Sequence, residues 1–115
     1  MAIPDTPLFV KTQDFILWLI QHTQRFPKRL RQSYTTRLES TMFDFQECIL
    51  MANTVRGPRR AELLETADGK LLFVRGLLRL AGELELLGGN QIRYASQSVD
   101  ELGRLLGAWR KGMDR

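Results

Sequence analysis

The side chains with the most distinctive chemistry in this sequence are cations that have no acidic residue near them. No Asp or Glu occurs between Phe15 and Leu38, and this stretch contains five cations: Arg25, Lys28, Arg29, Arg31 and Arg37. None of the five has an acidic residue three or four positions away, so no ion pair within one helix can neutralise them. Three of them lie within four residues after Pro27, where a helix is predicted to begin, and cations there oppose the helix dipole. This arrangement favours an anionic partner.

Arginine supplies most of the positive charge, since lysine accounts for only four of the 17 cations. The guanidinium group suits bidentate phosphate contacts and stacking on bases. Arg75 and Arg79 are spaced to lie along one helix face, although Glu83 is placed for a surface ion pair with Arg79. Few aromatic residues are interleaved with the cations, so we expect salt-sensitive contacts with backbone phosphates rather than base readout. The predicted nucleic-acid or partner-binding residues are Arg25, Lys28, Arg29, Arg31, Arg37, Arg75 and Arg79.

Catalytic chemistry has little support in the sequence. The chain has one histidine and one cysteine, His22 and Cys48, which are too few for a zinc site built from Cys and His. No motif surrounds either residue, which argues against a nucleophile–base pair. Asp44 and Glu47 lie three apart on a predicted helix, and a solvated helix face or a contact with cations on a neighbouring helix explains them without acid–base catalysis. We therefore expect no enzymatic activity, no catalytic residue, no metal and no cofactor.

Length and composition indicate one small globular domain. The 115 residues are 43% hydrophobic and 26% charged, with a formal net charge of +4, which is typical of a folded chain and fits a polyanionic partner. A single cysteine cannot form an internal disulfide, as expected in a reducing compartment. The first residues lack a signal peptide pattern, and the longest apolar run, Phe15 to Ile20, is too short to span a membrane. We expect one cytoplasmic domain covering residues 1–115, without membrane association.

Break signals divide the chain into four predicted helices. Pro27, Gly57-Pro58 and Gly88-Gly89-Asn90 leave segments of roughly 6–24, 27–56, 58–87 and 91–111. In the last three segments apolar residues recur every three or four positions, as in helices that face a shared core. Short connections make consecutive helices antiparallel, so the predicted fold class is all-α, an up-down four-helix bundle. One alternative stays open, because Asp68-Gly69 between apolar runs is also typical of a hairpin turn.

The predicted apolar surface exceeds what one bundle needs. The run from Phe15 to Ile20, which includes Trp18, is apolar on every side of a helix, whereas a monomeric bundle needs only one apolar face per helix. Gly103 and Gly107 share one face of the last predicted helix and would let another backbone approach, and Trp109 could anchor such an interface. These features favour an oligomer. The alternatives are cover of the run by neighbouring helices and the N-terminal arm, and fraying of the last helix.

Four segments together carry a family resemblance. They are Phe26-Pro27-Lys28-Arg29-Leu30-Arg31, Arg37-Leu38, Arg75-Gly76-Leu77-Leu78-Arg79-Leu80-Ala81 and Asp100-Glu101-Leu102-Gly103-Arg104-Leu105-Leu106-Gly107-Ala108-Trp109. They resemble the accessory variability determinant (Avd) family, whose members accompany the reverse transcriptase of diversity-generating retroelements. The F-P-K-x-x-R start and the E-x-G-x-x-L-G-x-W ending are its specific part, and the resemblance covers about residues 13–111. A Gly-Gly-Trp ending is common in the family, and here Ala108 replaces its second glycine.

The resemblance implies a four-helix bundle that assembles into a barrel-like homopentamer. It also implies that the chain binds a reverse transcriptase and its template RNA, with DNA or an RNA/DNA hybrid as further candidates, and supports mutagenic retrohoming in a bacterial or phage-infected bacterial cell. By the same resemblance, Lys28, Arg31, Arg37, Arg75 and Arg79 match basic positions of the family. The residues that it assigns to subunit packing are Glu101, Gly103, Gly107 and Trp109.

Two other functions compete with this interpretation. Four-helix proteins encoded by intervening sequences in bacterial 23S ribosomal RNA genes have a similar fold. A purely structural oligomerisation module would instead use its cations on acidic protein surfaces. The F-P-K-x-x-R start and the E-x-G-x-x-L-G-x-W ending favour the retroelement family over the first of these.

Overall fold

Four long helices dominate the part of the chain that the computed structural model describes, residues 3–113. Their bounds are α1 Pro7–Thr23, α2 Thr36–Ala52, α3 Gly57–Glu83 and α4 Gly89–Met113. A 3₁₀ turn, η1 (Lys28–Leu30), and a π-helical turn, η2 (Arg31–Thr35), lead directly into α2. No strand occurs within residues 3–113, so the all-α prediction is confirmed. The hairpin alternative at Asp68-Gly69 is wrong, because both residues lie inside α3.

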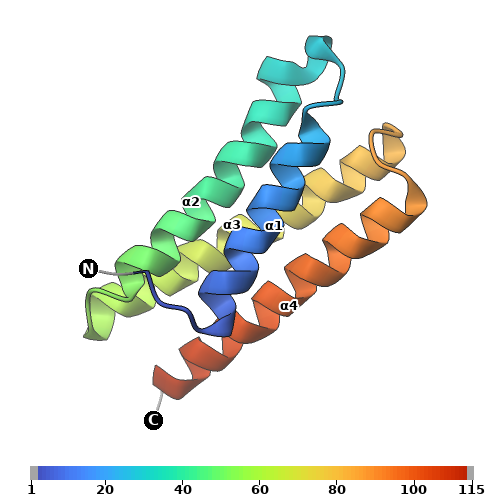
Figure 1. Ribbon diagram of the computed structural model, residues 1–115. Helices are drawn as coiled ribbons and strands as arrows, with labels where there is room; N and C mark the ends of the chain where they lie inside the picture. The colour runs from blue at the N-terminus through green and yellow to red at the C-terminus, as the bar shows by residue number, and fades with distance from the viewer. Residues whose placement is uncertain (1–2, 114–115) are drawn as a thin grey trace.

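The helices form an up-down bundle in chain order (Figure 1). α1 packs against α2 and α4, and α3 packs against the same two helices. The bundle is elongated along the helices, with extents of 44 × 24 × 23 Å. None of the described helices contains a stretch long and apolar enough to cross a membrane. The bundle therefore has two ends, formed by turns and helix termini, and long sides formed by helix faces.

The core forms because each helix buries one row of apolar side chains. In α2 the row is Leu38, Met42, Phe45 and Ile49, and in α4 it is Ala95, Val99, Leu102 and Leu106. This spacing of three and four residues is the one that the sequence predicts for a helix with one apolar face. All these side chains belong to a single buried cluster, and Leu30, Ile92 and Trp109 lie at its edge, partly buried.

The second helix departs from its predicted range of 27–56 at both ends. Pro27 precedes η1 as its N-cap instead of occupying a first helical position, and α2 ends at Ala52. Gly57 has a φ of 64°, a left-handed conformation that glycine adopts without the steric cost of a side chain. This glycine allows a sharp turn into α3, in which Pro58 follows at the second position.

The π turn before α2 has an anchor in the core. Tyr34 is buried in η2, and its hydroxyl donates to the backbone carbonyl of Leu77 in α3. The backbone N–H of Thr36 bonds to the carbonyl of Arg31, five residues earlier, as in π-helical geometry. The hydrogen bond from Tyr34 therefore holds the start of the α2 segment against α3.

Stability at alkaline pH should report on this buried phenol. Burial raises the pKa of Tyr34 to about 12, above its ordinary value near 10, so the folded state favours the neutral group. The neutral phenol contributes its full stabilisation to the folded state below about pH 10, and this stabilisation is lost as the pH rises towards 12. We expect Tyr34→Phe to lower the free energy of unfolding by about 0.5–1.5 kcal/mol at neutral pH, since a hydrogen bond is lost. The variant should also lose less stability than the wild type above about pH 10, as measured by urea denaturation.

Tyr94→Phe is the matched control for this experiment, because Tyr94 is exposed. It should follow the wild-type pH dependence. If Tyr34→Phe followed it as well, the phenol of Tyr34 would not be the group that titrates.

Candidate nucleic-acid interface

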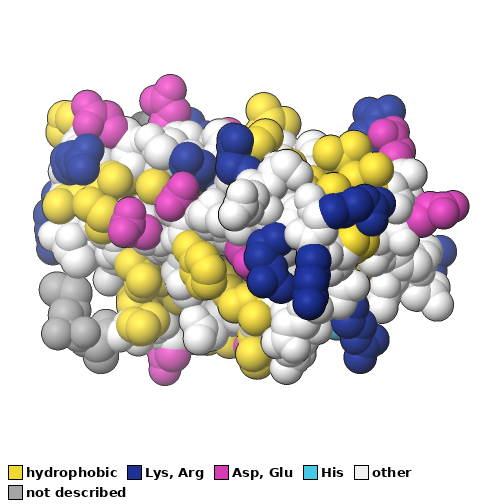
Figure 2. Space-filling view, turned by 90° about the horizontal axis from the view of Figure 1, so that it is seen from above, with side chains coloured by type: hydrophobic (Ala, Val, Ile, Leu, Met, Phe, Trp, Pro, Cys, Tyr) yellow, Lys and Arg dark blue, Asp and Glu magenta, His cyan; other side chains and the backbone are white. Residues whose placement is uncertain are grey.

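Four of the predicted cations gather at one end of the bundle. Arg25, Lys28, Arg29 and Arg31, which we call the end cluster, lie on the connection between α1 and α2, and all four are exposed. This end lies at the top of Figure 1 and faces the viewer in Figure 2, where Lys and Arg side chains gather on the surface. Across residues 3–113, no carboxylate lies within 4.0 Å of a cationic nitrogen of the end cluster.

Arg37 lies apart from the end cluster, on the side of the bundle between α2 and α3. Its guanidinium carbon is 5.2 Å from the centroid of the Phe73 ring, a geometry in which the ring face attracts the cation. The guanidinium is exposed and has no carboxylate partner among the described residues. Sequence reasoning missed Phe73, whose position 36 residues away is brought beside Arg37 by helix packing.

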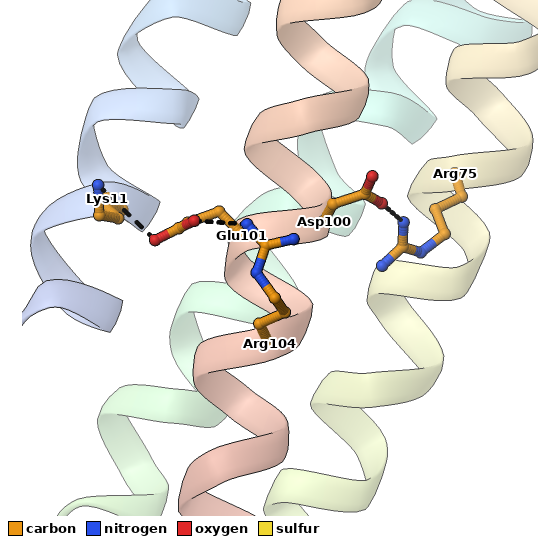
Figure 3. Close-up of polar contacts among 5 residues, drawn as sticks. All are labelled: Lys11, Arg75, Asp100, Glu101 and Arg104. Carbon is orange, nitrogen blue, oxygen red and sulfur yellow. Dashed lines mark hydrogen bonds and ion pairs between the residues drawn. The ribbon is translucent and has the colours of Figure 1, made fainter.

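Arg75 and Arg79 differ from the other five predicted cations because each has a carboxylate partner. Arg75 pairs with Asp100 of α4 (Figure 3), and Arg79 lies 3.8 Å from Glu83, one turn along α3. The second pair is the surface ion pair that the sequence spacing allowed, whereas the first joins residues from different helices. Their positive charge is locally compensated, so among the seven predicted cations those without a carboxylate partner in residues 3–113 are the end cluster and Arg37.

A polar network covers one side of α4, where subunit packing residues were predicted. Glu101 accepts a hydrogen bond from Arg104 at 2.6 Å and lies 3.9 Å from the ammonium nitrogen of Lys11 in α1 (Figure 3). Beside this network, a Cβ added at Gly103 would come within 2.8 Å of the Arg75 guanidinium. Gly103 therefore leaves room for Arg75 to reach across α4, and Glu101 links α4 to α1 within the chain.

The two tryptophans predicted to pack between subunits make their aromatic contacts within the chain. Trp18 stacks on His22 with ring centroids 4.0 Å apart and contacts Tyr94 at 4.9 Å. Trp109 meets the Phe9 ring edge-on at 6.0 Å. Both indoles are only partly buried, so a part of each ring system stays accessible at the surface.

Exposed apolar side chains remain on the sides of the bundle. In the all-round apolar run, Phe15, Ile16 and Leu19 are buried, whereas Leu17 is 58% exposed. On α3, Leu72 is 70% exposed, a position that sequence reasoning did not single out. A Cβ added at Gly107 would meet no atom within 4 Å, so this glycine, unlike Gly103, has no packing role inside the chain.

A family model described as bAvd-like matches residues 8–113. The chain belongs to the bAvd-like family. The match covers nearly the whole chain, and it confirms the resemblance to Avd proteins that the F-P-K-x-x-R and E-x-G-x-x-L-G-x-W motifs indicate. Among curated proteins, none matches the chain in sequence.

The two glycines of this bAvd-like chain should respond differently to alanine. Gly107→Ala should raise the free energy of unfolding by roughly 0.5–1 kcal/mol, because alanine is the better helix former and its methyl group meets nothing. Gly103→Ala gains the same helix propensity. Its methyl group also displaces Arg75 from Asp100, which removes a surface ion pair worth about 0–1 kcal/mol. We therefore expect a smaller gain at Gly103, measured by urea denaturation.

Arg75→Met is the control for this comparison, since it removes the guanidinium that the alanine would displace. In that background the two glycine substitutions should have equal effects. A loss of stability in Gly107→Ala would contradict the prediction and place this glycine against another chain.

Proposed function

We propose that this bAvd-like chain is a non-enzymatic accessory subunit of a diversity-generating retroelement. It binds the reverse transcriptase together with template RNA or cDNA and supports mutagenic retrohoming. Membership of the family supports the accessory role. The observation that carries nucleic-acid binding is the end cluster, in which four exposed cations have no carboxylate partner among the described residues.

The end cluster suits a phosphate backbone better than a protein surface. Its four cations occur within seven residues, from Arg25 to Arg31, and the connection that carries them stands at the end of the bundle (Figure 1). Three of the four are arginines, which can bind phosphate oxygens through two parallel hydrogen bonds. When binding releases counterions from phosphates, the logarithm of the binding constant falls linearly with the logarithm of the salt concentration. For single strands the slope is about −0.7 for each phosphate contacted.

We further propose that copies of the chain assemble, into a pentamer if they follow the family. The exposed Leu17 and Leu72 support this proposal, because a large apolar side chain on a helix face gains free energy when a partner covers it. Both leucines lie on sides of the bundle rather than on the end cluster. An assembly through the sides would leave the end cluster free to bind nucleic acid.

Charge reversal in the end cluster tests the nucleic-acid proposal. The triple variant Lys28→Glu, Arg29→Glu, Arg31→Glu should lose at least tenfold in affinity for single-stranded RNA at low salt, since about three phosphate contacts are removed. Its salt dependence should also flatten by roughly 2 on the log–log plot. Fluorescence anisotropy with a labelled RNA over a series of salt concentrations measures both quantities.

The matched control reverses three exposed cations elsewhere, Arg56, Arg59 and Lys111, for the same change in net charge. They lie on the connection between α2 and α3, at the start of α3 and near the end of α4, at the other end of the bundle (Figure 1). The control variant should keep most of the wild-type affinity for RNA. Equal losses in both triple variants would show that net charge rather than this site governs binding, and no binding by the wild type would favour a purely structural module.

Substitution of the exposed leucines tests assembly. Leu17→Asp and Leu72→Asp should each lower the molecular mass measured by light scattering, because a carboxylate would be desolvated at the interface. They are a cleaner test than Trp109→Ala, since Trp109 also packs against Phe9 within the chain. Gln97→Asp, at an exposed position of α4, adds the same charge as a control. A wild-type chain with the mass of a monomer would overturn the proposal.

A further inference from the structure

A small pocket lies beside the end cluster, between the end of α1 and the start of the α2 segment. Its volume is about 240 Å³, below the range of about 300–1,000 Å³ that is usual for drug-sized ligands. The polar residues that matter for its chemistry are Thr23, Arg31, Thr35 and Glu39, and the rings of Phe26 and Pro27 contribute an apolar wall. We call it the threonine pocket. Arg31 belongs both to this pocket and to the end cluster, so the two are continuous.

Thr35 has a buried hydroxyl that the protein leaves without a hydrogen-bond partner. The residue is only 8% exposed, and its Oγ1 is the one buried side-chain polar atom in residues 3–113 that lacks a partner. In regular α-helix, Thr12 and Thr41 donate to the carbonyl four residues earlier, at 2.7 and 2.6 Å. Thr35 instead lies in the π turn. Thr35 is among the residues that line the pocket, and a threonine in helical backbone has two accessible χ1 rotamers. Its hydroxyl is buried where it lies, and a change of rotamer would turn it towards a ligand in the pocket.

Glu39 adds a carboxylate to the lining of the pocket, and a carboxylate repels phosphate. Its Oε2 accepts a hydrogen bond of 2.6 Å from Thr23 Oγ1, and no Lys or Arg nitrogen of the described chain lies within 4.0 Å of it. An ionised carboxylate accepts up to about four hydrogen bonds. Glu39 therefore favours a hydroxyl or amino donor, while Arg31 attracts an anion.

These two preferences match a ribonucleotide, which carries a phosphate and, on its sugar, a 2′-hydroxyl that donates and accepts hydrogen bonds. We propose that the threonine pocket holds the ribose and phosphate of one nucleotide of a single-stranded RNA. Arg31 contacts its phosphate, Glu39 accepts from the 2′-hydroxyl, and Thr35 donates to the oxygen of the same hydroxyl. The inference rests on the proposed RNA binding and adds to it a means of distinguishing RNA from DNA.

The experiment compares three oligonucleotides of one sequence: single-stranded RNA, the same strand as DNA, and RNA with 2′-O-methyl groups. The wild type should bind RNA about tenfold more tightly than either of the others, the ratio that one hydrogen bond to a charged group supplies. Thr35→Val should bring this ratio close to one, and Glu39→Gln should lower it, because a neutral amide oxygen accepts a weaker hydrogen bond than a carboxylate; fluorescence anisotropy measures both. Glu39→Gln should also bind DNA more tightly, because it removes a negative charge near the phosphates.

Thr41→Val is the matched control, since its hydroxyl donates to the Arg37 carbonyl and is not among the groups that line the pocket. It should keep the wild-type ratio. Thermal unfolding should show Thr35→Val to be at least as stable as the wild type, because the lost hydroxyl is buried and has no partner in the protein.

Two results would overturn the inference: equal affinity of the wild type for all three strands, or an unchanged ratio in both pocket variants. The proposed function fails in a different way. If neither RNA nor DNA binds, nucleic-acid binding itself is wrong. If both bind equally and the end-cluster reversal abolishes binding of both, nucleic-acid binding stands and the threonine pocket has no part in choosing RNA.

Discussion

The end of the bundle that carries the end cluster depends on how the segment between α1 and α2 is held against the helices. Phe26 and Tyr34 are both buried, their ring centroids lie 6.2 Å apart, and the Tyr34 hydroxyl donates to the Leu77 carbonyl. With both ends of the segment anchored, the residues between them run over the surface. Lys28, Arg29 and Arg31 are consequently exposed to solvent. A hydrophobic and hydrogen-bonded anchor thus positions the charged surface.

The distribution of charge over the bundle gives this end its character. On the sides, Arg75 and Lys70 have carboxylate partners on neighbouring helices, whereas Arg37 has none among the described residues and lies over the Phe73 ring. The cations of the end cluster have none among the described residues, and uncompensated positive charge attracts polyanions over about one Debye length, roughly 10 Å at 0.1 M salt. The same end holds the threonine pocket, where Glu39 adds a short-range preference that the long-range charge lacks. Attraction and selectivity would therefore come from different residues of one surface.

The exposed apolar side chains complete this division of surfaces. Leu17 and Leu72 lie on helices along the sides of the bundle, away from the connection that carries the end cluster. Assembly through the sides and nucleic-acid binding at the end therefore need not compete for the same residues. The proposed adaptor role requires both kinds of contact at once, and the layout of the bundle provides for that.

Sequence alone was sufficient for features that depend on neighbours within one helix. The helical periodicity of three and four residues gave the four helices and most of the core, as the rows from Leu38 to Ile49 and from Ala95 to Leu106 show. The same local spacing revealed the uncompensated cations and the pairing of Arg79 with Glu83. Family membership, too, could be inferred from two linear motifs.

The tertiary structure decided whatever depends on how helices align with one another. The pairing of Arg75 with Asp100 joins residues 25 apart, and it gives Gly103 a role inside the chain because a Cβ there would meet the guanidinium. The π turn, the unpartnered hydroxyl of Thr35 and the bond from Thr23 to Glu39 give no periodic signal in the sequence. They arise where α1 meets the α2 segment. The sequence could not predict them, because the alignment of one helix against the next follows from the packing of the whole core.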